Sequence, residues 1–348
     1  MRTVLHVLPH PGGGGERYVD TLARMGGYRF ERVYLAPSPS PRDARRALPR
    51  TVWSAFRLAD LLHVHGEVAA AICLPALALR SSIVTFHGLN LLRRSTGLRH
   101  RVATANLRLV VHAASAAICV AETEAADVED ALGRRRNKNI IVIPNGVDIP
   151  DLPDAEECAA ARAGFGVSDE AVVGAWIGGL DAVKDPLTAV RAASAAATSG
   201  VPFVLLVAGE GPLLASIRAA ASVGPIGSVS MLGYQSDIRR VLAAADIFVL
   251  SSVREGLSYS LLDAMALARP AIVSDVPGNV EAVGPEGVDV APGDVAGFSA
   301  AIVGLATDSN HRHALGLRAR SRVQERFSAG EMVARTRELY DRVLERSS

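Results

Sequence analysis

The sequence predicts an α/β protein made of two doubly wound parallel sheets. Short β-branched runs alternate with longer Ala-, Leu- and Arg-rich segments of helical period, which is the pattern of βαβ units. The length of 348 residues suits two domains of ordinary size better than one. A Pro-rich, acidic segment at residues 144–157 interrupts the pattern near the middle of the chain, as a linker between domains does.

The candidate strands are the short apolar and β-branched runs. In the first half they are residues 3–8, 32–35, 61–65, 82–86, 116–120 and 139–143. In the second half they are residues 171–177, 202–208, 228–232, 246–250 and 271–274. We therefore predict an N-terminal Rossmann-like domain at residues 1–150 and a C-terminal Rossmann-like domain at residues 151–330.

Residues 331–348 are predicted to form a separate amphipathic helix. Its apolar side chains lie on or near one stripe of the helix surface. They are Met332, Val333, Leu339, Tyr340 and Leu344. The sequence does not identify the surface on which this stripe packs, and the N-terminal domain is one candidate.

The composition is that of an ordinary globular protein. Hydrophobic residues make up 49% of the chain, charged residues make up 21%, and the formal net charge is +1. This balance excludes a disordered chain and lacks the basic excess of a nucleic-acid-binding protein. We therefore expect no nucleic-acid partner.

Cysteine usage and apolar runs indicate the compartment. Cys73, Cys119 and Cys158 are odd in number and lack CxxC spacing, which argues against a disulfide framework and a zinc site. The N-terminal apolar run is too short for a signal peptide, and residues 69–79 fall short of the roughly 20 residues of a membrane span. We expect a cytoplasmic protein whose membrane contact, if any, is peripheral on the inner face.

The loops that follow strands are the expected ligand sites in open α/β sheets. After the first strand, residues 12–15 are glycines that let the backbone approach a ligand, and Glu16 opens a helix whose N–H groups could face an anion. A flexible turn is the alternative, and the spacing is not GxGxxG. After the fourth strand, His87 lies beside Gly88, where a structural and a functional role are both compatible with the sequence.

Five arginines lie among apolar positions just after His87. A solvated helix face is the ordinary interpretation of this pattern. The alternative is a patch that meets the phosphate groups of an acceptor or of a membrane surface. The residues are Arg93, Arg94, Arg99, Arg101 and Arg108.

Lys184 is unusual in this chain because Lys138 is the only other lysine. It lies in a loop between a predicted strand and a helix that begins at Pro186. A compact ammonium charge is well suited to a diphosphate. Lys184 is therefore a candidate anion ligand.

Two carboxylates frame the segment REGLSYSLLD, residues 254–263. Glu255 falls at a turn before a helix, where the macrodipole stabilises an acid by about 0.3 to 1 kcal/mol. That effect does not account for Asp263, which lies two turns into an apolar helix. Burying a carboxylate without partners is costly, so Asp263 should face a polar cleft or a specific donor, such as a hydroxyl-bearing ligand.

Taken together, these loops resemble a retaining glycosyltransferase of the GT-B fold, specifically family 4 (glycosyl transferases group 1). The resemblance spans nearly the whole chain through the segments GGGGE, TFHG, IPNGVD, GGLDAVKDP, GEGP, ADIFVLSS and REGLSYSLLDAMA. The last is the most specific, because two acids separated by seven residues lead into an Ala-Met-Ala helix. The resemblance implies two Rossmann-like domains that face each other across a cleft.

The resemblance also implies roles for individual residues. Gly13 and Gly14 would bring backbone amides towards the donor diphosphate and the transferred sugar. His87 would lie by the sugar near the reaction centre. Lys184 would neutralise the leaving diphosphate without a metal ion, and Glu255 would contact the sugar ring.

The remaining donor contacts implied by the resemblance lie in the second half. Asp263 would accept hydrogen bonds from the ribose hydroxyls. Three backbone amides would cap the sugar at a helix N-terminus, and two residues would lie near the base. These are Gly256, Leu257 and Ser258, and Gly233 and Tyr234, respectively.

Three positions depart from the family pattern. Gly179 stands where members usually carry Arg, so one partner of the diphosphate is missing. Asp263 is one methylene shorter than the commoner Glu, and Ser258 stands where Pro or another residue is often found. The missing arginine matters most, because each charge on a leaving diphosphate stabilises the transition state.

The expected function is transfer of a hexose-type sugar from a nucleoside-diphosphate donor to an acceptor hydroxyl, with retention and without a cofactor, a metal ion or a covalent nucleophile. The acceptor would be a glycan or glycolipid of surface polysaccharide or glycolipid assembly. Two other classes stay open. One is a non-catalytic relative that binds nucleotide sugars, motivated by Gly179, and the other is a GT-B sugar-nucleotide epimerase.

Overall fold

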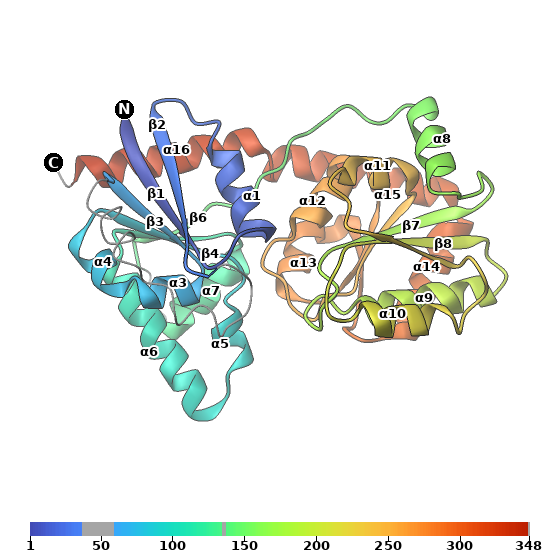
Figure 1. Cartoon of the computed structure of the whole chain (residues 1–348), viewed down its shortest axis with the longest axis horizontal. Coiled ribbons are helices and arrows are strands. Elements are labelled where there is room, and N and C mark those ends of the chain that lie inside the picture. The colour runs from blue at the N-terminus through green and yellow to red at the C-terminus, as the bar shows by residue number, and fades with distance from the viewer. Residues whose placement is uncertain (37–58, 134–136, 347–348) are drawn as a thin grey trace. The chain divides into compact units, whose positions relative to one another are not determined.

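A computed structural model describes residues 1–36, 59–133 and 137–346 of the chain. The chain divides into two compact units (Figure 1). The first contains Met1–Gly146 and Ala329–Ser348, and the second contains Val147–Ser328. These divisions follow Gly146 and Ser328, whereas the predicted boundaries follow residues 150 and 330.

Six parallel strands form the sheet of the first unit, in the order β2-β1-β3-β4-β5-β6. Their bounds are Arg2–Leu8 (β1), Tyr28–Tyr34 (β2), Leu61–His65 (β3), Ser82–Phe86 (β4), Ala116–Cys119 (β5) and Ile140–Val142 (β6). The six predicted strands are confirmed, and β3 and β4 have the predicted bounds. β2 begins earlier than predicted. The prediction missed its first residues because they are partly exposed, carry charges and form no apolar run.

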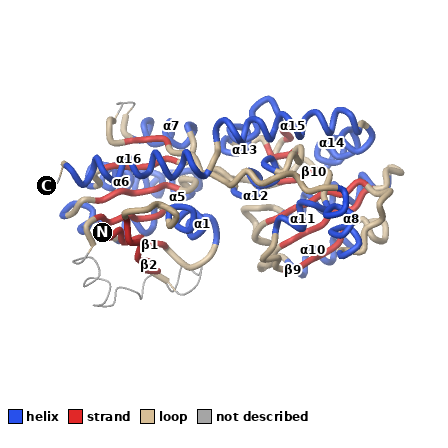
Figure 2. The backbone as a smooth tube through the Cα atoms, turned by 90° about the horizontal axis from the view of Figure 1, so that it is seen from above, coloured by secondary structure: helices blue, strands red, loops and turns tan. Residues whose placement is uncertain are grey.

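Helices cover both faces of this sheet. Their bounds are Gly13–Leu22 (α1), Glu67–Ile72 (α3), Leu74–Leu79 (α4), Asn90–Arg94 (α5), Gly97–Ala113 (α6), Glu122–Ala131 (α7) and Ala329–Glu345 (α16). On one face, α3, α4 and α6 pack over a core that includes Val64 and Phe86. On the other face, α1 and α16 lie side by side (Figures 1 and 2).

The C-terminal helix α16 packs on the sheet of the first unit. Most of the predicted apolar stripe is buried, including Met332, Leu339 and Tyr340. The Tyr340 hydroxyl lies 2.6 Å from His63 Nδ1 on β3. Although α16 is the last element of the chain, it therefore completes the core of the first unit.

The second unit repeats the plan with the strand order β12-β11-β10-β7-β8-β9. The strands are Val172–Ile177 (β7), Phe203–Ala208 (β8), Val229–Gly233 (β9), Ile247–Leu250 (β10), Ala271–Ser274 (β11) and Gly287–Val290 (β12). The five predicted strands are confirmed to within one residue at each end. β12 was missed, because this short edge strand begins with glycine, contains an aspartate and is only partly buried.

Helices of the second unit also lie on both faces of its sheet (Figure 1). They are Ala155–Gly164 (α8), Pro186–Thr198 (α9), Leu214–Ala221 (α10), Ile238–Ala244 (α11), Tyr259–Ala266 (α12), Pro277–Val283 (α13), Val295–Thr307 (α14) and Ser309–Arg326 (α15), with a 3₁₀ turn at Gly284–Glu286. None of the described helices combines the length and the apolar composition that crossing a bilayer requires.

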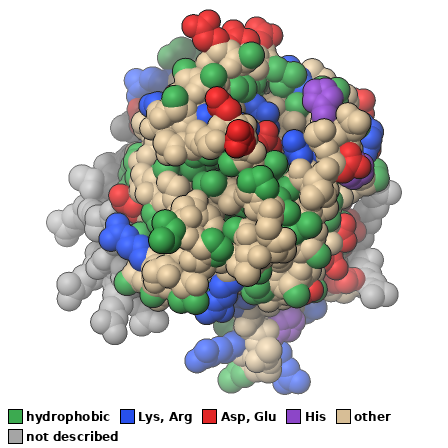
Figure 3. All heavy atoms as spheres, turned by 90° about the vertical axis from the view of Figure 1, so that its right-hand side faces the viewer, with side chains coloured by type: hydrophobic (Ala, Val, Ile, Leu, Met, Phe, Trp, Pro, Cys, Tyr) green, Lys and Arg blue, Asp and Glu red, His purple; other side chains and the backbone are tan. Residues whose placement is uncertain are grey.

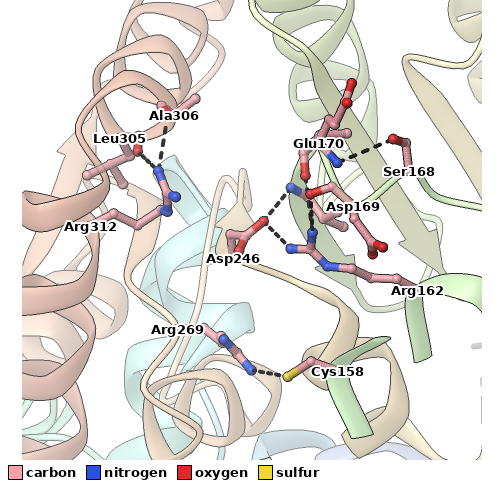
Figure 4. A network of polar contacts seen from close by, with 12 residues as sticks. Cys158, Arg162, Ser168, Asp169, Glu170, Asp246, Arg269, Leu305, Ala306 and Arg312 are labelled. Atoms are coloured by element: carbon pink, nitrogen blue, oxygen red, sulfur yellow. Dashed lines mark hydrogen bonds and ion pairs between the residues drawn. The ribbon is translucent and has the colours of Figure 1, made fainter. Parts of the chain in front are cut away.

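An ion pair holds α8, the first helix after the linker, to the second sheet (Figure 4). Arg162 Nη2 lies 2.7 Å from Asp246 Oδ2, which also accepts the N–H of Val173 at 2.8 Å. Arg162 also donates to the carbonyl groups of Asp169 and Ala171. One guanidinium thus ties α8 to the beginnings of β7 and β10.

Each sheet has one point at which the order of its strands reverses. In the first sheet it lies between β1 and β3, and in the second between β7 and β10. Loops leave the sheet in opposite directions at such a point and open a crevice beyond the carboxyl ends of the strands. The loops after these four strands are therefore where a ligand site is expected.

Candidate functional site

The second unit brings a lysine and a glutamate together at its reversal point. Lys184 Nζ lies 2.6 Å from Glu255 Oε1, and the Ser252 hydroxyl donates to the same oxygen at 2.7 Å. Lys184 follows β7 and Glu255 follows β10. The Glu255 side chain is 8% exposed and that of Lys184 is 28% exposed. Protein atoms therefore enclose the carboxylate, while the Lys184 side chain remains partly exposed.

Backbone hydrogen bonds fix the position of Lys184. The N–H of Val253 donates to the carbonyl of Val183 at 2.9 Å. The Ser251 hydroxyl donates to the carbonyl of Asp185 at 2.6 Å. These two bonds join the loop after β10 to the residues on either side of Lys184, so the ion pair is set by the backbone as well as by its side chains.

Two glycines allow close approach of the loops around this pair. A Cβ on Gly278, in α13, would lie 1.6 Å from the carbonyl oxygen of Gly256. A Cβ on Gly209, after β8, would lie 1.9 Å from the carbonyl oxygen of Gly178. Neither distance is possible between non-bonded atoms, so only glycine fits at these positions.

The predicted donor-binding residues Gly256, Leu257 and Ser258 form the turn between Glu255 and α12. Leu257 and Ser258 are buried. The Ser258 hydroxyl lies 3.2 Å from that of Ser260 and makes no capping bond to α12. The structure therefore places this turn directly between the Glu255 carboxylate and the helix.

Asp263 is partly buried in the second turn of α12. Gly233 and Tyr234 lie at the end of β9, and β8 separates that strand from β7. Gly233 adopts a left-handed backbone with φ 68°, and Tyr234 is 70% exposed. The predicted base-binding residues thus stand two strands away from the strand that leads to Lys184.

The resemblance leads one to expect arginine at position 179. The backbone conformation at this position does not require the glycine that is found there. Its φ lies outside the left-handed region. Within 4 Å, a Cβ at this position would meet only Asp181 Oδ2 among the described residues, at 3.3 Å. The missing arginine is therefore a difference in side-chain chemistry and not a consequence of space.

A second candidate site lies in the first unit, at the ends of β1, β3 and β4. A pocket of about 400 Å³ is lined by the predicted residues Gly13, Gly14 and His87, and also by His65 and Arg94. The backbone of Gly13 is left-handed, with φ 78°. The structure thus brings together the three residues that the sequence placed in this half.

Glu16 holds the glycine turn and is not directed at a ligand. Its carboxylate accepts the N–H of Gly12 and the hydroxyl of Tyr34. These two hydrogen bonds lower the pKa of Glu16, since they favour the charged form. The carboxylate therefore serves the conformation of the loop after β1.

Glu124 on α7 holds the loop that follows His87. It is buried and accepts the N–H of Gly88 at 2.6 Å and that of Val120 at 2.8 Å. Leu89, the residue after Gly88, has a left-handed backbone with φ 39°, a conformation that a residue with a bulky side chain rarely adopts. Burial raises the pKa of Glu124 to about 7, although the two hydrogen bonds oppose the shift.

Glu67 on α3 anchors the same loop further along. Its carboxylate accepts the N–H groups of Leu91 and Leu92, at 2.7 and 3.1 Å, at the beginning of α5. Burial raises the pKa of Glu67. Burial also lowers the pKa of His87 to about 4, so this imidazole is neutral near pH 7. Two carboxylates thus shape the wall of the pocket around a neutral histidine.

The five predicted arginines separate into two groups. Arg93 pairs with Asp127 at 2.6 Å, and Arg108 donates to the carbonyl of Ala131. The other three, Arg94, Arg99 and Arg101, are exposed on α5 and α6. Figure 3 shows Lys and Arg side chains beside a hydrophobic one at the lowest point of the view. With exposed apolar neighbours they form a surface that we call the α5–α6 surface: Leu91, Arg94, Leu98, Arg99, Arg101, Val102 and Leu109.

Several residues of these sites were not predicted from the sequence. His65 did carry a signal, because HVHG ends one strand as TFHG ends the next. Ser252, Glu124 and Gly278 carried none, since each acts on a residue of another loop or helix. Their roles become visible only when the partners are placed in space.

Comparisons with known proteins identify two families along the chain. Residues 171–308 match the family described as Glycosyl transferases group 1. Residues 5–150 match the family described as Glycosyltransferase Family 4. Each matched range covers most of one sheet, and together they contain all the site residues discussed above.

Two of the curated relatives match about half of the chain. EpsF of Bacillus subtilis (strain 168) is 27% identical over 48% of this chain and 44% of EpsF. The UDP-Gal:alpha-D-GlcNAc-diphosphoundecaprenol alpha-1,3-galactosyltransferase of Escherichia coli is 27% identical over 58% of this chain and 54% of that enzyme. The chain thus spans about half the length of these relatives.

A solved structure covers almost the whole chain. Anabaena HepE, crystallised in complex with UDP-glucose, has a TM-score of 0.81 at 17% identity, over 98% of this chain and 100% of HepE. At this identity the likeness concerns the fold alone, which is the two-sheet fold of GT-B glycosyltransferases.

The raised pKa of Glu124 predicts a pH-dependent stability. The carboxyl is neutral in the folded protein up to about pH 7, whereas in the unfolded chain it ionises near 4.5. The contribution of Glu124 to the free energy of unfolding is therefore complete below pH 4.5 and is lost as the pH rises to 7. At 1.36 kcal/mol per pKa unit, the loss is about 3 kcal/mol. Glu124→Gln lacks the titrating group and so lacks this loss. We therefore expect the difference in unfolding free energy between the wild type and the variant to change by about 3 kcal/mol over this pH range.

Denaturant unfolding of the full chain at pH 4 and pH 8 measures the shift. Because the two proteins share every other titrating group, their difference isolates Glu124. Glu122→Gln, which changes an exposed carboxylate of the same helix, is the control. A gap for Glu124→Gln that stays constant with pH would contradict the assigned pKa.

Proposed function

The chain belongs to the glycosyl transferases group 1 family, and on this premise we propose that it moves a sugar from a nucleoside-diphosphate donor to an acceptor hydroxyl with retention at the anomeric carbon. The observation that carries this proposal is the Lys184–Glu255 pair at the reversal point of the second sheet. It unites the rare lysine and the first acid of the REGLSYSLLD segment, which the sequence separates by 71 residues.

The proposed donor is a nucleoside-diphosphate sugar. The name of the E. coli relative specifies UDP-Gal, and the HepE structure contains UDP-glucose. Both ligands present a diphosphate next to a hexose. A partly exposed lysine side chain offers an ammonium charge suited to a phosphate oxygen of such a ligand, and the adjacent carboxylate is the acceptor we assign to a sugar hydroxyl.

We assign the donor contacts in the second unit as follows. Lys184 neutralises the diphosphate, and Glu255 accepts a hydrogen bond from the sugar ring. The turn after Glu255 supplies the backbone N–H groups of Gly256, Leu257 and Ser258 near the N-terminus of α12, where the helix dipole favours negative charge. Asp263 accepts from the ribose, and Gly233 and Tyr234 lie near the base.

We assign Gly13, Gly14 and His87 of the first unit to the diphosphate and the transferred sugar. Their support is that all three line one pocket at the reversal point of the first sheet. The neutral state of His87 suits a hydrogen bond to an uncharged sugar hydroxyl.

The proposed reaction needs no covalent intermediate. The acceptor oxygen forms a bond to the anomeric carbon on the face that the diphosphate leaves. The bond from that carbon to the phosphate oxygen breaks, and the acceptor proton passes to the departing phosphate. Lys184 stabilises the negative charge that grows on the diphosphate, and this electrostatic effect is the main contribution we assign to the protein.

We propose an acceptor from glycan or glycolipid assembly, presented at the cytoplasmic face of a membrane. The E. coli relative is named for a diphosphoundecaprenol-linked acceptor. On the α5–α6 surface, Leu98, Val102 and Leu109 are exposed and fall on one stripe of α6, with Arg99 and Arg101 beside them. Apolar side chains flanked by arginines are suited to an anionic bilayer surface.

Turnover of alanine variants tests the donor site. We expect Lys184→Ala and Glu255→Ala each to lower kcat by at least about 100-fold, the size of effect seen when one group that stabilises transition-state charge is removed. Product formed from a matched nucleotide sugar and acceptor is the measurement. Lys138→Ala, which removes the only other lysine, is the control and should retain full activity.

Full turnover by both Lys184→Ala and Glu255→Ala would refute this site. Donor binding without transfer to any of a broad panel of acceptors would instead favour the non-catalytic relative that Gly179 suggests. Conversion of the nucleotide sugar in the absence of an acceptor would favour the epimerase.

Membrane contact is tested by co-sedimentation with vesicles of phosphatidylcholine, with and without phosphatidylglycerol. We expect binding only to the anionic vesicles. The double variant Leu98→Ser/Val102→Ser should bind about tenfold more weakly, since each lost apolar side chain removes up to about 1 kcal/mol of partial burial.

The matched control is Leu79→Ser, which removes an equally exposed leucine on α4 in the same unit. It should sediment with the vesicles as the wild type does. Equal binding by the control and the double variant would show that the α5–α6 surface is not the contact.

A further inference from the structure

Four histidines gather on one side of the first sheet, next to the pocket. His6 lies on β1 and pairs in register with His63 on β3, while His65 ends β3 and His87 follows β4. The three histidines on strands are at most 1% exposed. The core on this face of the sheet, beneath α1 and α16, is therefore unusually rich in imidazole.

Hydrogen bonds join three of these rings into a line that ends at the pocket. His6 Nδ1 lies 2.9 Å from His65 Nε2. His65 Nδ1 lies 3.1 Å from His87 Nε2. His63 stands outside the line, because its two nitrogens contact the hydroxyls of Tyr340 and Thr85, each at 2.6 Å.

Each ring in the line is neutral near pH 7. Burial lowers the pKa of His6 and His65 well below 6.5, and nearby histidines lower them further. A neutral imidazole carries one N–H and one lone pair. Each hydrogen bond therefore needs one proton between its two nitrogens, and the two bonds must run in the same direction.

Only two arrangements satisfy this requirement. In the first, His6 Nδ1–H donates to His65, and His65 Nδ1–H donates to His87 Nε2. In the second, both bonds are reversed, so that His87 Nε2–H donates to His65 and His65 donates to His6. The two arrangements leave different atoms at the far end of the line.

The end atom, His6 Nε2, decides between them. It is buried, and none of the described residues offers it a hydrogen-bond partner. In the first arrangement Nε2 carries a lone pair, and in the second it carries a proton. Buried N–H groups without a partner are rarer in proteins than buried acceptors with an unused lone pair, so the first arrangement is favoured.

We infer that His65 is a positioning residue that holds His87 in its Nδ1–H tautomer. His87 Nε2 is then occupied as the acceptor from His65, and the polar atom left for a ligand is an N–H donor. His87 can donate to an oxygen of a ligand in the pocket, such as a sugar hydroxyl or a phosphate oxygen, but it cannot take a proton through that atom. The role of His87 towards a sugar rests on the proposed function, whereas its tautomer does not.

A metal ion is the competing explanation for the cluster. One ring nitrogen from each of His6, His63 and His65 lies within 4.8 Å of the others. However, the rings of His6 and His65 are stacked at 22° and those of His63 and His65 at 28°, whereas ligands of one ion must point their lone pairs at a common centre. Apart from His6 Nε2, the nitrogens of these three rings are also engaged with another imidazole or with a hydroxyl.

Long-range ¹H–¹⁵N NMR spectra of the full chain, labelled at the histidine side chains, report each tautomer directly. His87→Gln assigns the His87 signals. We expect wild-type His87 to be neutral at pH 7 and to be present as the Nδ1–H form by about tenfold or more. This spectrum requires no destabilised variant, and a dominant Nε2–H form would overturn the inference.

A pair of matched variants tests whether His65 is responsible. His65→Leu removes the donor to His87 Nε2, so the Nε2–H form should become well populated. His63→Leu removes a histidine of the same strand and equal burial that does not contact His87 by a hydrogen bond, and it should leave the tautomer unchanged. The same His87 tautomer in all three proteins would overturn the role of His65.

Two further readouts separate the alternatives. Tightly bound zinc in the purified protein, at one equivalent and lost in the His6→Leu variant, would overturn the hydrogen-bonded line in favour of a metal site.

Sugar transfer is measured on the same samples. A wild type with the expected tautomer but no transfer activity would count against the proposed function alone, and an active wild type with Nε2–H His87 would count against this inference alone.

Discussion

The contact between Lys184 and Glu255 is the interaction on which the account depends. Glu255 is enclosed by protein, and an enclosed carboxylate without a cation is strongly unfavourable. Lys184 supplies that cation from the next strand of the sheet, held by backbone bonds from the loop after β10. Because Lys184 remains partly exposed, the group that stabilises Glu255 is also the group that a diphosphate would meet.

The two units use the same construction at their reversal points. In each, a carboxylate is held beneath the surface, and in the second unit glycines also let loops approach closely. In the second unit that carboxylate is Glu255, whose partner Lys184 is partly exposed. In the first unit the buried carboxylate is Glu124, which is used to hold the loop after His87. The first unit therefore presents a neutral imidazole where the second presents a charged pair.

The sequence predicted the sheets well because buried parallel strands are continuous apolar runs. It missed β12 and the start of β2, where edge strands are partly exposed and polar. It named Lys184 and Glu255 but not their contact, since periodicity carries no information on which loops meet. It missed Glu124 and Ser252 for the same reason. Gly278 was missed because its role is to make room for Gly256, a steric relation between residues of different elements.

Calorimetric titration with nucleoside diphosphates tests the central claim most directly, because it requires neither the sugar nor the acceptor. UDP and GDP, with the matching monophosphates, are titrated into the wild type and Lys184→Ala. The account predicts that at least one diphosphate binds the wild type, with a Kd about tenfold or more higher in the variant, while the monophosphate binds both proteins alike. An unchanged Kd for the diphosphate in Lys184→Ala would contradict the account.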